Sequence, residues 1–400
     1  MRVEEESALP KQSQDLLEEE TERPTGRQRK QWRQSEEGES QGVDEIARDL
    51  FPAEGRRGGW LIALLFFGAG LLVNWIWPVA LPDDLSSYLV KSWNLKEGLG
   101  LSDASGTLKL SRPLFPALMS FAEWLGGEGI KSAYFVVWFA TALCPALLYL
   151  FARRIFGPGI ALTAGLFAFT SYPIHYYGYR HLDALWPALI LLGMLALVKA
   201  FTVPALKRWW FLAGFAYGCA ALTKELAIVF AVAPLLCCLW HRALWRREWL
   251  RGSILTGAVT IGLFFSWALI TVSLGDGGQV AGGRKTMLLR DLFERGTIEL
   301  LLEGAQFFIR GLQVYLKKRI LTYFYLGPLI VAAWLYIALR ALRGELHSKL
   351  LLSHLIVYLP FLSYIGYYSF RVGQGILIFL FGALALALLV HQGSWWLARM

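Results

Sequence analysis

The chain has 400 residues, of which 56% are hydrophobic and only 17% are charged, and its formal net charge is +9. About a quarter of the residues of an ordinary soluble protein are charged. The mean hydropathy of +0.45 and the apolar runs of about twenty residues therefore exclude a soluble globular protein, and we expect an integral membrane protein.

The charge is divided unevenly along the chain. Residues 1–57 contain 15 of the 30 acidic residues and 10 of the 39 basic ones, so this segment is acidic although the chain is basic. It shows no apolar periodicity and cannot bury enough surface to offset the entropy lost on folding. We therefore expect a disordered acidic cytoplasmic tail at 1–57, followed by one transmembrane domain at 58–400.

Ten apolar segments approach the length of about 20 residues that a membrane-spanning helix needs. They lie at about 60–80, 132–152, 156–173, 182–202, 209–223, 225–241, 252–274, 320–341, 350–369 and 375–395. Basic residues such as Arg153, Arg154 and Arg340 gather in the short loops on one side, which we place in the cytoplasm. Two long outer loops remain, at 81–131 and 275–319. The expected fold is an all-α polytopic bundle of about ten transmembrane helices.

The first outer loop predicts two amphipathic helices that lie in the membrane interface. The first begins after Pro82 and ends at Gly98, whereas the second has Ser111 as N-cap and Pro113 in its first turn. The apolar stripe expected on the second helix consists of Leu114, Phe115, Leu118, Phe121, Ala122 and Leu125.

Charged residues at the membrane edge are the first candidates for chemistry. A carboxylate at Asp83 or Asp84, where the first span leaves the membrane, could accept a proton from an incoming hydroxyl. The alternative is that one caps the next helix and the other is solvated. Arg112 could hold a phosphate at a helix N-terminus, or it could contact lipid head groups instead.

Several short motifs follow one another in a characteristic order. They are Asp83–Asp84, Tyr88, WNLKEGLGL (93–101), RPLFPAL (112–118), LLYLFARRIFGP (147–158), HLDALWPALILLGMLAL (181–197), LAGFAYGCAALTKELAIVFAVAPLL (212–236) and YYSFRVGQGILIFL (367–380). This order resembles family 39 of the C-type (GT-C) glycosyltransferases, which includes dolichyl-phosphate-mannose protein mannosyltransferases and lipid A aminoarabinose transferases. The resemblance extends from residue 60 to about residue 390.

The resemblance implies a membrane enzyme with a polyprenyl-phosphate-linked sugar as donor. Such an enzyme passes the sugar to a hydroxyl acceptor (glycan, lipid or protein) on the non-cytoplasmic side, in one inverting displacement. Asp84 or Asp83 would be the general base. The donor phosphate would be bound by Arg112, Lys224 and Arg371, and substrate contacts would come from Tyr88, Asp183 and His181. Apart from these substrates we expect membrane lipids as partners and no nucleic acid.

Each of the later candidates has a structural alternative. Lys224 could form an ion pair with its neighbour Glu225, and Arg371 could extend to the lipid head groups. Asp183 could pair with Arg180.

No metal ligands are predicted. The spacing of His175, His181 and Asp183 matches no standard metal site. We assign no cofactor, and the sequence leaves open whether the protein binds a divalent cation.

A polytopic lipid or small-solute transporter or flippase is the alternative from another functional class. Transporters combine ionisable mid-span residues with repeated halves, whereas here the ionisable residues gather at one membrane face and no halves repeat. This favours the enzyme over the transporter; a non-catalytic assembly factor with the same fold is a third interpretation. We expect the protein in a bacterial inner membrane, with its active site facing the periplasm or the cell exterior.

Overall fold

The computed structural model describes residues 58–76, 85–101, 112–126, 129–171, 174–175, 184–273, 306, 327–368 and 376–397. All of them belong to the unit formed by residues 51–400. The contacts within the chain divide this unit from residues 1–50, so we describe it by itself. The predicted tail at 1–57 lies outside the described residues, as does the predicted outer loop at 275–319 apart from Gln306.

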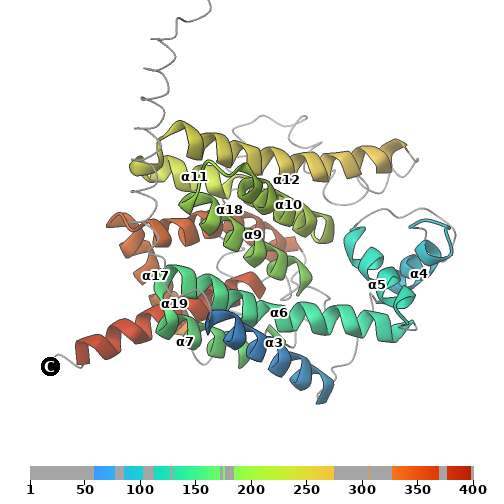
Figure 1. The fold of residues 1–400 in the computed structure, drawn as a ribbon, viewed down its shortest axis with the longest axis horizontal. Helices are drawn as coiled ribbons and strands as arrows, with labels where there is room; N and C mark the ends of the chain where they lie inside the picture. The colour runs from blue at the N-terminus through green and yellow to red at the C-terminus, as the bar shows by residue number, and fades with distance from the viewer. Residues whose placement is uncertain are drawn as a thin grey trace, which may run out of the picture. The chain divides into compact units, whose positions relative to one another are not determined.

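In the part of the chain that the structure describes, every regular element is a helix (Figure 1). The elements are α3 (Gly58–Ile76), α4 (Leu85–Lys96), α5 (Leu114–Trp124), α6 (Ile130–Phe156), α7 (Pro158–Phe169), α9 (Leu185–Thr202), α10 (Lys207–Thr223), the 3-10 helix η1 (Glu225–Ala231), α11 (Ala233–Trp240), the 3-10 helix η2 (Arg242–Leu244), α12 (Arg247–Ser273), α17 (Gly327–Leu342), α18 (Leu346–Tyr368) and α19 (Ile376–Leu397). The predicted all-α membrane fold is confirmed.

Each of the ten predicted spans corresponds to a helix or helix pair, but they differ in length. Five helices are long and apolar enough to cross a membrane, namely Gly59–Ile76, Ile130–Phe156, Leu185–Thr202, Arg247–Ile270 and Leu377–Ser394. The shorter apolar helices within the described residues are Pro158–Phe169, Ala227–Trp240, Val331–Leu342 and Leu346–Leu359. A count of ten spans is therefore not established.

The predicted span at 156–173 is longer than the helix found there. Gly157 has φ +88°, a value that favours glycine, and it separates α6 from α7. Pro158 then opens α7, which has 12 residues and ends at Phe169. A helix of this length covers about 18 Å, well short of a bilayer core of about 30 Å.

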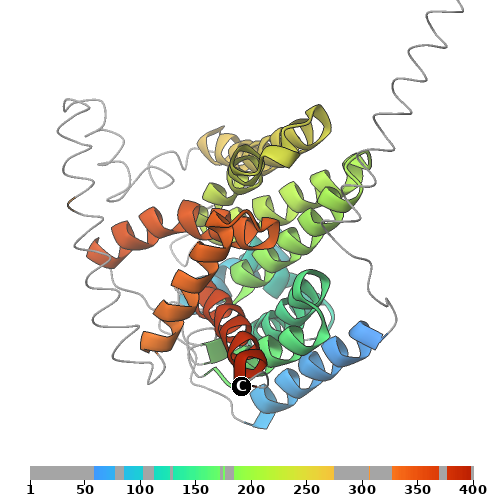
Figure 2. The ribbon, with the colours of Figure 1, turned by 90° about the vertical axis from the view of Figure 1, so that its left-hand side faces the viewer.

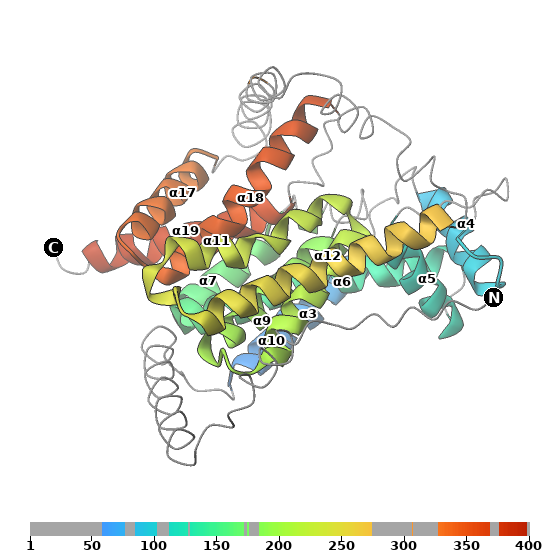
Figure 3. The same ribbon diagram turned by 90° about the horizontal axis from the view of Figure 1, so that it is seen from above.

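The long helix α6 lies at the centre of the packing. It contacts α3, α7 and α9, whereas α10 packs between α9 and α12. On the other side, α19 packs on α7 and on α17, and α17 also contacts α18 (Figure 2; Figure 3).

Two glycines of α10, Gly214 and Gly218, lie in close contact with α12. A Cβ atom added to Gly214 would lie 2.5 Å from the backbone oxygen of Thr256, and one added to Gly218 would lie 2.8 Å from Leu263. The hydroxyl of Thr260 donates a hydrogen bond of 3.1 Å to the backbone oxygen of Gly214. Glycine thus lets the two backbones approach closely enough for hydrogen bonds between helices, as is typical of membrane interiors.

The helix packing gives the bundle two distinct ends. α6 and α9 both begin beside α5, because Phe115, Val137 and Leu185 share one apolar cluster (Figure 1). α6 has 27 residues and so extends about 40 Å, which separates its beginning from Arg153 and Arg154 near its end by about the thickness of a bilayer core. α5 and the two arginines near the end of α6 therefore lie at opposite ends of the bundle.

Candidate functional site

The two helices predicted in the first outer loop are present as α4 and α5. α4 ends where Gly98, at φ +76°, turns the chain away from the helix. α5 has Pro113 rather than Ser111 as its N-cap, with no capping hydrogen bond from a side chain. The predicted cap at Ser111 is therefore wrong, because Arg112 takes a left-handed backbone conformation, with φ +56°, immediately before Pro113.

The predicted apolar stripe of α5 is partly wrong. Phe115 and Ala122 are buried as expected, but Phe121 and Leu125 are more than half exposed. The buried face of α5 consists of Phe115, Pro116, Met119, Ala122 and Glu123. The buried face of α5 is thus rotated relative to the predicted apolar stripe. It includes the carboxylate of Glu123, which binds polar partners on the neighbouring helices.

Glu123 is a buried carboxylate that the sequence analysis did not single out. Its Oε1 atom accepts hydrogen bonds from the hydroxyls of Ser92 on α4, at 3.0 Å, and Ser132 on α6, at 3.3 Å. These bonds join α4 and α5 to the beginning of α6. The one available signal was the position of Glu123 as the sole acidic residue in the apolar sequence of α5.

Arg112 connects this helix pair to a distant part of the chain. Its Nε atom lies 3.3 Å from Oε1 and 3.4 Å from Oε2 of Glu225, the first residue of η1. Burial alone would lower the pKa of the Arg112 guanidinium, but the Glu225 carboxylate and a hydrogen bond with the Tyr88 hydroxyl raise it overall. Arg112 is thus a fixed cation held by two partners.

Tyr88 is positioned by its own neighbours on α4 and α5. Its ring packs edge-on against Phe115, with 5.3 Å between the ring centroids. The ammonium group of Lys91, a lysine that is only 4% exposed, lies 5.8 Å from the centre of the same ring. Lys91 was not predicted as a site residue, although a lysine on the same side of a helix as Tyr88 is a signal that helix periodicity supplies.

Lys224 lies between the spans predicted at 209–223 and 225–241. It has an extended backbone, with φ −147° and ψ 111°, and it stands between the end of α10 and the beginning of η1. It is only 4% exposed. Glu225, the next residue in the chain, forms an ion pair with Arg112. Glu225 is therefore adjacent to both candidate cations, because it contacts Arg112 and directly follows Lys224.

The other predicted site residues lie outside the described residues. They are Asp83, Asp84, His181, Asp183 and Arg371. The structure therefore brings together Arg112, Tyr88 and the beginning of η1, and the roles of the remaining five stay predictions. Among the described residues, no group of three or more His, Cys, Asp and Glu side chains could hold a metal ion, so a divalent cation stays an open prediction as well.

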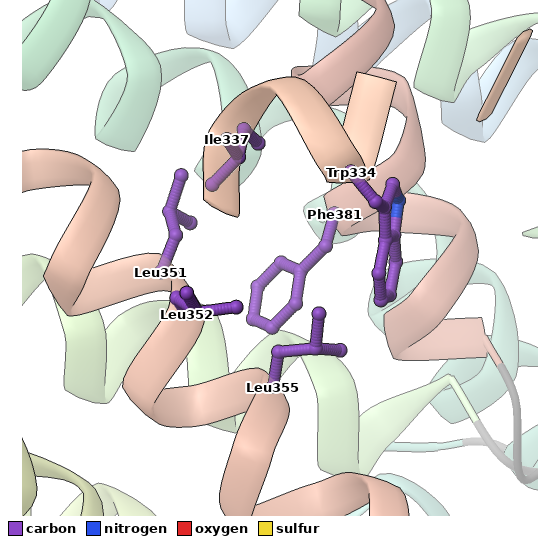
Figure 4. A pocket seen from close by; sticks show the side chains of 6 residues that line it. All are labelled: Trp334, Ile337, Leu351, Leu352, Leu355 and Phe381. Carbon is purple, nitrogen blue, oxygen red and sulfur yellow. The ribbon is translucent and has the colours of Figure 1, made fainter. Parts of the chain in front are cut away.

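An apolar crevice between α17, α18 and α19 is too small for a sugar (Figure 4). Its volume is about 20 Å³, which corresponds to about one water molecule. Its walls are the side chains of Trp334, Ile337, Leu351, Leu352, Leu355 and Phe381. It is therefore not a substrate site by itself.

One protein-family model matches part of this chain. Residues 111–270 match the family model described as dolichyl-phosphate-mannose-protein mannosyltransferase. A comparison with curated protein sequences finds no match.

Two solved structures are similar to this chain, both of an oligosaccharyltransferase from Archaeoglobus fulgidus. One is AglB in complex with an inhibitory peptide and a dolichol-phosphate, with 15% identity, a TM-score of 0.48 and coverage of 84% of this chain and 51% of the other. The second, tethered to an acceptor peptide with the NVT sequon through a disulfide bond, has 14% identity, a TM-score of 0.48 and coverage of 85% and 51%. The chain thus spans about half of the length of these structures.

The family match begins one residue before Arg112 and continues through Glu225 into α12. It therefore includes both partners of the ion pair that joins the first outer loop to η1. The predicted resemblance is confirmed over residues 111–270, where this chain is similar to the dolichyl-phosphate-mannose-protein mannosyltransferases.

Proposed function

We propose that this protein is a membrane glycosyltransferase that moves a sugar from a polyprenyl-phosphate donor to a hydroxyl acceptor on the non-cytoplasmic side. The observation that carries the proposal is the meeting of Arg112, Tyr88 and Glu225, which belong to three separate motifs of the predicted family pattern. The family match over residues 111–270 supports a donor in which a sugar is attached to an isoprenoid phosphate.

The proton in this reaction would be accepted by Asp84 or Asp83. Asp84 directly precedes Leu85, the first residue of α4, and Tyr88 lies four positions further along the chain. In a single displacement, the acceptor oxygen attacks the anomeric carbon and loses its proton to the carboxylate, while the bond to the phosphate oxygen breaks. Attack from the face opposite the phosphate inverts the anomeric configuration.

The leaving phosphate gains negative charge as this bond breaks. A cation fixed in advance stabilises that charge without reorganising during the reaction, and one such donor is typically worth about 3 kcal/mol. Arg112 has this property because Glu225 and Tyr88 hold its side chain. Lys224 and Arg371 would complete the phosphate site, and Lys91 is a further buried cation beside Tyr88.

Glu225 has the role of a positioning residue in this proposal. Its carboxylate faces Arg112 with both oxygens within 3.4 Å of Nε. Because Nε faces Glu225, the terminal nitrogens of the Arg112 guanidinium would be the donors to a phosphate. A bacterial inner membrane, with the site open to the periplasm or the cell exterior, agrees with the basic residues at the opposite end of the bundle.

The proposal is tested with the purified full chain in lipid nanodiscs. Radiolabelled polyprenyl-phosphate sugars are supplied, and sugar release or transfer is measured for the parent, Asp84→Asn and Asp83→Asn. Loss of the general base should lower turnover at least a hundredfold in one variant. Glu97→Gln, at an exposed position just after α4, is the matched control and should retain full turnover.

Two outcomes would contradict the proposal. If both aspartate variants keep the turnover of the parent, neither residue is the base. If the parent releases no sugar but carries the labelled lipid across vesicle membranes, the protein is a flippase instead.

A further inference from the structure

A buried histidine is hydrogen-bonded between two helices of the bundle. His354 lies on α18, within the span predicted at 350–369, and its side chain is fully buried. Its Nδ1 atom lies 2.8 Å from the backbone oxygen of Leu350, which can only accept, so Nδ1 carries the hydrogen. In the neutral ring Nε2 is then an acceptor, and the hydroxyl of Tyr217 on α10 donates a 2.7 Å hydrogen bond to it.

The ring of Tyr217 packs directly on the backbone of a third helix. A Cβ atom added to Gly193 on α9 would overlap this ring, so glycine is what allows the two helices to come this close. Tyr217 is fully buried as well. The hydrogen bond between Tyr217 and His354 therefore connects α18 to the packed pair of α9 and α10.

Ring stacking extends this hydrogen-bonded pair into η1. The ring of Phe230 on η1 lies nearly parallel to those of His354 and Tyr358, with 5.8 Å and 5.7 Å between the centroids. It also lies 6.1 Å from the ring of Tyr217. Phe230 thus contacts both members of the pair, and through it η1 is joined to α10 and α18.

The conformation of η1 depends on contacts of this kind. A 3-10 helix has poorer hydrogen-bond geometry than an α-helix, so side-chain packing must supply more of its stability. η1 begins at Glu225, five residues before Phe230, and Glu225 forms the ion pair with Arg112. The position of Glu225 relative to Arg112 therefore depends on how η1 packs against α10 and α18.

We propose that His354 is a positioning residue for sugar transfer, which acts through Tyr217 and Phe230 on η1 and thereby on Glu225. Both side chains of the hydrogen-bonded pair are fully buried, so neither reaches a substrate directly. Ionisable side chains inside a membrane are rare and costly, and they are retained mainly for function. The inference rests on the proposed function and extends its machinery from the outer loop into the bundle.

A double-mutant cycle with the purified full chain in lipid nanodiscs tests this role. Tyr217→Phe removes the hydroxyl but keeps the ring, and it should lower sugar transfer per folded protein roughly tenfold. In the Glu225→Gln background the same substitution should lower transfer by less than about twofold, because Glu225 no longer holds Arg112. A loss of folded protein alone would lower transfer equally in both backgrounds.

Tyr149→Phe is the matched control. Tyr149 is also fully buried, and its hydroxyl accepts a 2.9 Å hydrogen bond from Arg153. It lies on α6 toward the end opposite α5, away from the ring stack on η1. The same chemical change at this position should leave sugar transfer unchanged.

Three further variants check the pathway through the rings. Phe230→Leu keeps the hydrogen bond but removes the ring on η1, so it should behave like Tyr217→Phe, and it takes the place of that variant in the cycle if Tyr217→Phe fails to fold. His354→Gln retains a side-chain oxygen that can accept from Tyr217. It should therefore keep more transfer than His354→Phe, which cannot accept.

The outcomes distinguish this inference from the proposed function. If the parent transfers sugar but the loss in Tyr217→Phe is absent, or is equal in the two backgrounds, the positioning role is overturned and the proposed function stands. Equal transfer in His354→Gln and His354→Phe overturns it as well. If the parent transfers no sugar, the proposed function fails, and the positioning role fails with it.

Discussion

The Nε atom of Arg112 lies 3.3 Å from the Oε1 atom of Glu225, although 113 positions separate these residues in the chain. This ion pair connects the loop before α5 to the beginning of η1, and both side chains are about three-quarters buried. It fixes a cation of the first outer loop against the core of the bundle.

Glu225→Gln should therefore lower sugar transfer much more than stability. Because the pair is about three-quarters buried, removing the charge of one partner should cost roughly 1–3 kcal/mol, so the unfolding temperature should decrease only modestly. Transfer should decrease roughly tenfold or more, because Arg112 is no longer held in place for the leaving phosphate. Thermal unfolding and turnover are measured on the same preparations.

Glu248→Gln removes a carboxylate from an exposed position at the beginning of α12 and serves as the control. Equal turnover in the two variants would mean that Glu225 does not position Arg112 for catalysis.

Arg112→Gly and Arg112→Ala should separate backbone strain from side-chain function. Both variants lose the guanidinium, so both should lose transfer. Only glycine adopts a φ of +56° without strain, and the left-handed conformation costs other residues roughly 1–2 kcal/mol. We therefore expect Arg112→Gly to be more stable than Arg112→Ala by about 1 kcal/mol, as measured by chemical unfolding. An alanine variant that equals or exceeds the glycine variant in stability would show that the backbone here is not strained.

Two glycines of α12 should respond in opposite directions to alanine. A Cβ atom added to Gly252 would overlap the ring of Trp210, which is fully buried on α10. Gly262 has no heavy atom within 4 Å of such a Cβ atom. Gly252→Ala should lose about 1–3 kcal/mol of stability through overpacking, whereas Gly262→Ala should gain about 0.5–1 kcal/mol. Thermal unfolding in one detergent measures both, and equal effects would contradict the helix contact between α10 and α12.

His241 should make the protein less stable in mild acid. Its Nδ1 atom lies 3.3 Å from the ammonium group of Lys349, and burial together with this charge lowers its pKa below the ordinary value of 6.5. Above pH 6.5 the ring is neutral in both the folded and the unfolded chain. As the pH falls below this value the unfolded chain takes up the proton more readily, so stability is lost.

His241→Asn removes the titrating ring but keeps a polar side chain beside Lys349. The decrease in unfolding temperature between pH 8 and pH 5.5 should be smaller in this variant than in the parent. An identical decrease in both proteins would assign the acid sensitivity to other groups.

The positions of the helices could be predicted because apolar length and helix breakers are local properties. Gly98 ends α4 as expected, and the small residues Gly214 and Gly218 mark a close helix contact. The helix within the span predicted at 156–173 is shorter, because it begins at Pro158, directly after Gly157, and ends at Phe169. Composition cannot show where a backbone turns.

Much of the site could not be predicted from sequence, since it depends on contacts between distant residues. Arg112 and Lys224 were selected by family resemblance and by position at the membrane edge. Neither criterion shows that Glu225 pairs with Arg112, nor that Glu123 is buried between Ser92 and Ser132. Pairings over such distances follow from the packing of α4 and α5 on the bundle, which hydrophobic periodicity does not determine.

The 3-10 helix η1 has 7 residues, an unusual length for this geometry. It rises about 2.0 Å per residue, against 1.5 Å in an α-helix, so conversion to α-helix would shorten this segment by roughly 3.5 Å. Lys224 and Glu225 lie at the beginning of η1, and α11 follows its end. A change of this length in η1 would therefore shift Glu225, and with it the anchored end of its ion pair with Arg112, relative to α11.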